Sequence, residues 1–501
     1  MSGPLRLVPD EGAPGWAEET MWLRTLPRRF RPDPAPASAP PELSADPIDE
    51  LAERLAEVCA DAVHPYEIAA FLEADGLTDE QAALNYGRPD AFTLAEELFA
   101  KVERRYPGVP GAVADPWRAD PWRCVLRGLV FALPGLGYLL GADLFSSSRR
   151  HLGLPSGMAA MALATLASWA WNQALAHRAY GWLGRTDRRA AGRSLALGAP
   201  AGALLAAGIG YLVGGPAPAL WFIAGQAGYL AAATVLLVLG REVVLLIALA
   251  PSVAGGGLVL VVDLPPAARA GVLLSTLGCA LGLAGWAVLG CLRTAPSGAA
   301  GSPPLHQTLP AGLFGLAVGT LTLVAALGGE LHHAVRPASA STAGATGPAM
   351  AALTLSLGLA EWLLYRYRGQ AVRGLRTSHS AAAFRRHACG LFALCLLGYL
   401  AATAALDLAA TALWPQATAL PATRLAALLL LAAALWTALL LQAFGLGLVA
   451  GLVCAAAAGF EAAALAGGVQ PLTLQLIGGG AAATLLGLLA CVVLGRTTSH
   501  R

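Results

Sequence analysis

The sequence predicts an all-α polytopic membrane protein with about twelve transmembrane helices in two six-helix halves, preceded by a small cytoplasmic helical domain. Its 501 residues are 56% hydrophobic and 13% charged, with a mean hydropathy of +0.60, whereas soluble domains carry roughly 25% charged residues. The charge is also unevenly divided: residues 1–123 hold 23 acidic and 12 basic side chains, and residues 124–501 hold 8 acidic and 21 basic ones. An acidic soluble segment therefore precedes a long apolar one.

The N-terminal 123 residues divide into three parts. Residues 1–46 are rich in proline and show no periodic apolar pattern, which predicts a disordered tether. Residues 47–107 predict a small acidic domain of four short helices, one of which opens with a capping box at Thr78. Residues 108–123 repeat the sequence Asp-Pro-Trp-Arg, a composition typical of the membrane interface, and predict an interfacial linker.

Residues 124–494 predict a transmembrane domain, because their apolar segments are long enough to cross about 30 Å of hydrocarbon at about 20 residues each. Many of these segments are rich in glycine and alanine, which allow helices to approach closely. A short cytoplasmic tail, residues 495–501, is expected after them. The twelve expected spans are 124–144, 154–176, 194–214, 219–240, 243–262, 270–292, 308–329, 348–366, 388–409, 424–443, 446–467 and 472–494.

The distribution of arginine predicts that both termini are cytoplasmic. Cytoplasmic loops of membrane proteins carry an excess of Lys and Arg. With the N-terminus inside, the inner connections and the tail hold 15 arginines, and the outer connections hold five. We therefore expect a multi-pass protein of the plasma membrane. Lys101 is the only lysine among the 33 basic residues, a bias typical of bacterial genomes of high GC content.

The same residues disfavour several classes of protein. Nucleic-acid binding needs a basic face, which the acidic N-terminal segment lacks. The chain has no Walker lysine motif, no GxGxxG after a strand and no GxSxG turn. We therefore expect no enzymatic activity and no cofactor, and any transport would be secondary or driven by a partner. The eight cysteines include no CxxC pair, so they are expected to be buried apolar side chains, with no metal site.

Two arginine-rich loops, six spans apart, indicate an internal duplication. Gln173 precedes Arg178 by five residues, and Glu361 precedes Arg366 by the same spacing. An aromatic and basic cluster follows each pair. Duplicated halves are typical of transporters, in which the substrate site lies at the interface between the halves, near the bilayer midplane.

The segment 174–195 (ALAHRAYGWLGRTDRRAAGRSL) resembles a loop of the multidrug/oligosaccharidyl-lipid/polysaccharide exporter superfamily. In that superfamily span two runs into a short Gly-x-x-Asp-x-x-x-Ala loop, which Gly184, Asp187 and Ala191 match. The resemblance covers about twenty residues and the twelve-span layout, and it implies a flippase for polyprenyl-linked sugars or an antiporter for drugs. The residues of the loop motif typical of the major facilitator superfamily also occur here, but their spacing differs from that motif, so this resemblance is weaker.

The chain also departs from that superfamily in two ways. Flippases of diphosphate-linked sugars with this layout keep cationic side chains inside the cavity. Here spans one, two and eight are expected to carry arginines only at their ends, at Arg127, Arg178 and Arg366. The acidic N-terminal domain is an addition to the superfamily layout.

Polar side chains inside the expected spans are the site candidates, because a charge at the centre of a membrane helix costs about 2.5–3.5 kcal/mol on insertion scales. Three deep acids are interpreted as coupling or gating groups, with neutral packing residues as the alternative: Glu361, Asp407 and Glu461. Three amides are expected either to face a cavity or to hold helices together: Asn172, Gln173 and Gln226. The arginine-rich loops supply candidate gating residues: Asp187, Arg188, Arg366 and Arg368. For Glu361 the alternative is a polar pair within its own helix near the inner boundary.

Two functional hypotheses follow from this sequence. The first is a secondary transporter or flippase-like exporter of a lipid-linked saccharide or another amphipathic envelope precursor, working by alternating access. The second is a non-transporting membrane scaffold for envelope assembly, growth or division, which would present residues 47–107 to a cytoplasmic protein partner. A membrane glycosyltransferase is less favoured because the loops contain few acids. In each case membrane lipid is the surrounding partner, and nucleic acid is not.

Overall fold

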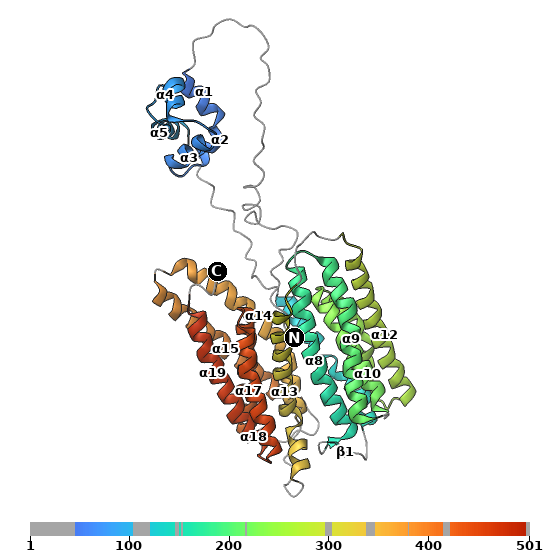
Figure 1. The fold of residues 1–501 in the computed structure, drawn as a ribbon. Helices are drawn as coiled ribbons and strands as arrows, with labels where there is room; N and C mark the ends of the chain where they lie inside the picture. The colour runs from blue at the N-terminus through green and yellow to red at the C-terminus, as the bar shows by residue number, and fades with distance from the viewer. Residues whose placement is uncertain are drawn as a thin grey trace. The chain divides into compact units, whose positions relative to one another are not determined.

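A computed structural model describes residues 46–103, 121–145, 150–151, 154–215, 218–295, 303–336, 346–378, 380–413 and 421–496. The described chain forms two compact units, the N-terminal domain and the membrane domain (Figure 1). The expected tether, the expected interfacial linker up to residue 120 and the last five residues of the chain lie outside the described residues.

The N-terminal domain contains five helices rather than the expected four. They enclose a core of aliphatic side chains, among which Ile48, Ile68 and Leu94 are fully or almost fully buried. The first expected helix is broken at Leu55, which ends one helix and begins the next. The five helices are α1 (Pro47–Arg54), α2 (Ala56–Asp61), α3 (Pro65–Ala74), α4 (Asp79–Tyr86) and α5 (Ala91–Lys101).

Side-chain caps define where these short helices begin. The hydroxyl of Thr78 accepts a hydrogen bond from the backbone N–H of Gln81, and the Gln81 side chain accepts one from the N–H of Thr78, so the expected capping box is formed. Asp90 caps α5 by accepting from the N–H of Thr93 at 2.7 Å. Local sequence signals therefore determine the helix boundaries of this domain.

The described residues of the membrane domain form helices and a single short β-pair. Eleven helical segments of the described chain are long and apolar enough to cross a membrane. The first half contains α6 (Pro121–Ala132), α7 (Gly135–Gly141), η2 (Ala142–Phe145), β1 (Arg150–His151), β2 (Leu154–Pro155), α8 (Ser156–Leu183), α9 (Arg188–Gly214), α10 (Ala219–Val238), α11 (Glu242–Val259) and α12 (Pro266–Leu292). The second half contains α13 (Leu305–Val335), α14 (Gly347–Thr377), α15 (Ala381–Leu413), α16 (Ala422–Ala443), α17 (Gly447–Ala466), α18 (Pro471–Leu474), η3 (Gln475–Gly479) and α19 (Gly480–Leu494).

The expected twelve spans match this arrangement, with two local differences. Span two corresponds to α8, which is 28 residues long but is not among the eleven most apolar segments. At about 1.5 Å per residue it still reaches about 42 Å. The first span is a broken helix, because α6 ends before Pro134 and α7 continues from Gly135. The fold is an all-α polytopic membrane protein.

Equivalent helices of the two halves make equivalent contacts. Within the halves, α8 packs on α9 as α14 packs on α15, and α10 packs on α12 as α16 packs on α19. The first span contacts the fifth in each half, as α6 with α11 and α13 with α17. Between the halves, α8 contacts α13 and α6 contacts α14. The first two spans of each half therefore form its main contacts with the other half.

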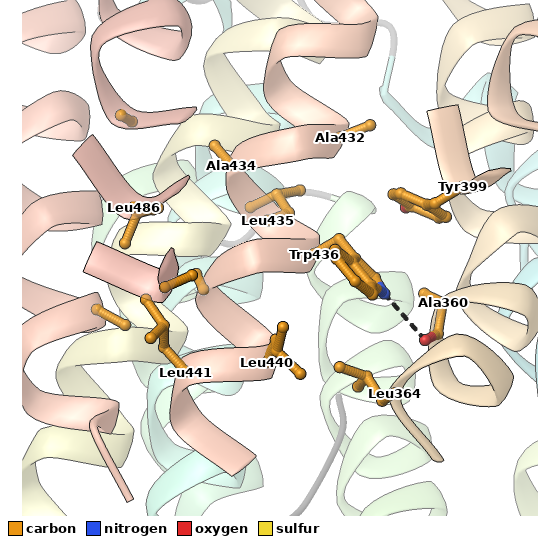
Figure 2. Close-up of a cluster of buried hydrophobic side chains, with 14 of the residues drawn as sticks. Ala360, Leu364, Tyr399, Ala432, Ala434, Leu435, Trp436, Leu440, Leu441 and Leu486 are labelled. Carbon is orange, nitrogen blue, oxygen red and sulfur yellow. Dashed lines mark hydrogen bonds between the residues drawn. The ribbon is translucent and has the colours of Figure 1, made fainter. Parts of the chain in front are cut away.

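A cluster of buried hydrophobic side chains, mostly leucine and alanine around Trp436, forms the core of the second half (Figure 2). The indole of Trp436 is fully buried and donates a hydrogen bond from Nε1 to the backbone oxygen of Ala360 at 3.1 Å. The rings of Phe392 and Tyr399 stack on it at centroid distances of 5.9 and 6.1 Å. The indole therefore ties α16 to α14, the helix that also contacts the first half.

Candidate functional site between the two halves

Glycine brings α6 and α14 together at one of the two most extensive helix contacts between the halves. A Cβ atom at Gly128 would lie 3.1 Å from the backbone oxygen of Leu355, and one at Gly358 would overlap the backbone oxygen of Cys124. The two backbones are therefore close enough to exclude larger residues at these positions. This close approach places the side chain of Arg127, which directly precedes Gly128 on α6, against α14.

Arg127 forms ion pairs with a carboxylate from each half. Its Nη2 and Nε donate to Oε1 of Glu242 on α11 at 2.5 and 3.0 Å, and its Nη1 donates to Oε1 of Glu361 on α14. Tyr365, one turn after Glu361, is close enough to interact with the same guanidinium. Arg127 and Glu242 belong to the first half, whereas Glu361 and Tyr365 belong to the second. We call Arg127, Glu242 and Glu361 the inter-half ion cluster.

The inter-half ion cluster is largely withdrawn from solvent. The side chains of Glu242 and Glu361 are 8% and 11% exposed, and that of Arg127 is 29% exposed. A buried charge needs a partner, and removing one member of a buried pair destabilises a protein by about 3–5 kcal/mol. With all three groups ionised the cluster carries one net negative charge, so Arg127 is the group on which both carboxylates depend.

At the contact between α8 and α13 the two helices also approach closely at a glycine, but uncharged residues stand at the positions that correspond to Arg127 and Glu361. On α13, a Cβ atom at Gly315 would lie 2.8 Å from both the backbone oxygen of Trp169 and Cγ of Gln173 on α8. Residues 127 and 315 are 188 positions apart, and so are residues 173 and 361. The pair Arg127–Glu361 therefore occupies the same place at one contact as Gly315 and Gln173 at the other. This correspondence fits the duplication that the sequence predicts.

These positions change the interpretation of Glu361 and Arg127. Glu361 pairs with Arg127 from the other half, not with the arginines of its own helix. Arg127 was expected at the end of its span, but α6 begins at Pro121, and Arg127 lies more than a turn inside it. Sequence reasoning missed Arg127 and Glu242, because their partners are distant in the chain. The signal that could have pointed to the cluster is that an acid in or beside a membrane span needs a nearby cation, which applies to both Glu242 and Glu361.

The arginines after Glu361 point to other partners. The guanidinium of Arg366 lies over the ring of Trp362 at 5.2 Å. That of Arg368 lies over the ring of Phe444 at 5.4 Å and donates to the backbone oxygen of Ala443 at 3.5 Å. Both contacts are within the second half, so neither arginine links the halves through them.

The two other candidate acids are buried within the second half. Asp407 on α15 is 1% exposed, and neither of its carboxylate oxygens has a hydrogen-bond partner among the described residues. The charge of Arg424, at the start of α16, acts on it. Glu461 on α17 is 2% exposed and packs against Gly478 in the π-helical turn η3, with no ion pair to another described residue. Neither acid belongs to the inter-half ion cluster.

The candidate amides occupy two different places. Asn172 and Gln173 are buried on α8, and Gln173 lies at the contact with α13. Gln226 lies on α10 inside the first half, where its amide nitrogen donates to the hydroxyl of Tyr138 at 2.9 Å. Gln226 therefore lines a pocket of one half rather than the interface between the halves.

The loop between α8 and α9 supplies the N-cap residue of α9. The carboxylate of Asp187 is buried and accepts a hydrogen bond from the backbone N–H of Ala190 at 2.8 Å, which makes it the N-cap of α9. Arg188, the first residue of α9, is exposed. No group of three or more metal-binding side chains occurs among the described residues.

Comparison of the chain with protein-family models, with curated proteins and with solved structures finds no match. The geometry of the two halves and of the inter-half ion cluster is therefore the basis for assigning a function.

Proposed function

We propose that the chain is a secondary transporter or flippase-like exporter that moves an amphipathic envelope precursor, such as a lipid-linked saccharide, by alternating access. The observation that carries the proposal is the ion pair between Arg127 and Glu361, which joins two halves with equivalent helix contacts. Alternating access requires that contacts between two rigid halves open on one face and close on the other. An ion pair across the halves is a contact that can break and reform.

The second carboxylate makes this opening feasible. When the halves separate, Arg127 can keep its two hydrogen bonds to Glu242, which belongs to its own half. Only Glu361 then loses its partner. The energetic penalty of an unpaired buried arginine is therefore avoided in the open state. In this mechanism Glu361 is the gating acid, and Asp407 and Glu461 are the coupling acids of the second half.

The proposal is tested by measuring distances between the halves on both membrane faces. Spin labels at Ala295 and Thr377 report the face of the arginine-rich loops, and labels at Leu212 and Leu413 report the opposite face; all four residues are exposed. Double electron–electron resonance on the full chain in nanodiscs is expected to give two distance populations on each face. Glu361→Gln should lengthen the first distance and shorten the second. A single population on both faces, unchanged by Glu361→Gln, would refute alternating access.

A scaffold function is the second candidate, and the N-terminal domain favours it. This domain has its own core and carries exposed apolar side chains at Val63, Tyr66 and Phe92, of which the last two form an edge-to-face pair at 5.7 Å. Exposed aromatic side chains on a small domain are typical of a docking surface. If deletion of residues 46–103 abolishes the cellular phenotype while Glu361→Gln, Asp407→Asn and Glu461→Gln preserve it, the scaffold is the better account.

A further inference from the structure

The first half contains an apolar pocket that is separate from the inter-half ion cluster. It encloses about 340 Å³ between α7, α10, α11 and α12, a volume at the lower end of the roughly 300–1,000 Å³ of small-molecule sites. Glycine and aromatic side chains shape it: Phe222 fills the space next to Gly141, and its ring packs on Tyr138 and Phe145 at 5.5 and 5.2 Å.

Three of the polar side chains in the wall of this pocket, Gln226, Ser252 and Thr276, are hydrogen-bonded to other side chains; Tyr229 also lines the wall. Gln226 donates to the hydroxyl of Tyr138 at 2.9 Å, and the hydroxyls of Ser252 and Thr276 share a hydrogen bond at 2.8 Å. The remaining wall is formed mostly by leucine, glycine and aromatic residues. A polar solute would have to disrupt these pairs, whereas a hydrocarbon chain would not. The wall therefore favours an apolar occupant.

The mouth of the pocket opens sideways, on the lipid-facing surface of the membrane helices. Trp221 and Leu274 line it and are 83% and 67% exposed. Such apolar side chains on membrane-spanning helices face the hydrocarbon of the bilayer. Near the ends of the spans, Arg269, next to the lining residue Ala270, pairs with Asp143 at 2.7 Å. An apolar recess therefore lies beside a charged rim, an arrangement that fits a lipid whose headgroup stays at the membrane surface.

We infer that this pocket is a binding site for one acyl chain of a membrane lipid, in the leaflet opposite the arginine-rich loops. The site does not depend on the inter-half ion cluster or on the proposed transport. The chain enters between Trp221 and Leu274 and contacts Leu273 and Leu277 on α12. Recognition is by the hydrocarbon, since the polar pairs of the wall are closed, so it should be insensitive to the headgroup.

The test is photo-crosslinking of the full chain in nanodiscs, with phosphatidylcholine that carries a diazirine within one acyl chain. Adducts mapped by mass spectrometry are expected to concentrate on the lining segments 221–229 and 270–277. Gly225→Leu places a side chain in the pocket beside Leu277 and should reduce these adducts several-fold. The matched control is Gly278→Leu on α12, where an added Cβ atom meets no neighbour and labelling should not change.

Three results would overturn the inference. They are uniform labelling around all lipid-facing helices, equal labelling of Gly225→Leu and wild type, and labelling that depends on headgroup charge when phosphatidylglycerol replaces phosphatidylcholine. The last would place recognition at Arg269 instead of in the pocket. If Gly225→Leu fails to fold, Ala270→Phe at the exposed rim blocks the same mouth and is expected to give the same reduction.

Discussion

Replacing Arg127 by glutamine is expected to destabilise the membrane domain far more than replacing Glu361 by glutamine. In the wild type, one guanidinium neutralises two carboxylates that are 8% and 11% exposed. Arg127→Gln removes the ion-pair partner of both carboxylates and leaves Glu242 only the charge of Arg123, with which no ion pair is formed. Breaking a buried pair in this way costs about 3–5 kcal/mol. Glu361→Gln leaves the pair of Arg127 and Glu242 intact and exchanges one charged hydrogen bond for a neutral one, a loss of about 0.5–1.5 kcal/mol.

Thermal unfolding of the purified chain in detergent, followed by tryptophan fluorescence, measures both losses. The triple variant Arg127→Gln, Glu242→Gln and Glu361→Gln has no buried charge at this site, so it should be more stable than Arg127→Gln alone. Arg188→Gln is the matched control, because this arginine is exposed on the same half. Equal losses for Arg127→Gln and Glu361→Gln, or a triple variant no more stable than Arg127→Gln, would refute the assignment of the cluster.

Three further predictions concern packing and the N-terminal domain. Gly358→Leu should prevent the halves from packing and reduce the folded yield in size-exclusion chromatography, whereas Gly398→Leu, where an added Cβ atom meets no neighbour, should not. In the fragment 46–103, Thr78→Ala removes the cap of α4 and should lower the free energy of unfolding in urea by about 1 kcal/mol, with Thr78→Ser close to wild type. The hydrogen bond from Arg88 lowers the pKa of Glu97 in this domain. Because the folded-state pKa lies below the unfolded one, the stability from Glu97 is complete above about pH 4.3 and is lost as the pH falls further. Glu97→Gln should therefore weaken the acid dependence of unfolding, and an unchanged profile would contradict this ion pair.

The sequence predicts most of the fold because the signals involved are local. Spans are visible as long apolar segments, and the caps at Thr78 and Asp90 lie next to the helices that they begin. The break at Leu55 was not predicted, because the apolar face continues through it and no glycine or proline marks it. Pro134, in contrast, does mark the break in the first span.

The candidate site was only partly predictable, because its contacts join residues that are far apart in the chain. Arg127 is 115 residues from Glu242 and 234 residues from Glu361. The sequence identified Glu361 as a deep acid and aligned it with Gln173, but it placed Arg127 at the end of a span. In the structure α6 starts at Pro121, so Arg127 lies more than a turn inside this helix, and its side chain reaches both Glu242 and Glu361.

The two inter-half contacts differ in the charge that would be left unpaired if the halves separated. At the contact of α8 with α13, Gly315 and Gln173 are neutral, so separation there leaves no charge behind. At the contact of α6 with α14, separation leaves the first half neutral, because Arg127 stays with Glu242, and it leaves Glu361 as an unpaired carboxylate. A proton, a cation or a cationic group of the substrate must then neutralise Glu361 in the open state. If a proton does so, the open population between Ala295 and Thr377 should increase as the pH is lowered, and Glu361→Gln should abolish that dependence. A pH dependence that persists in Glu361→Gln would assign the coupling to Asp407 or Glu461 instead.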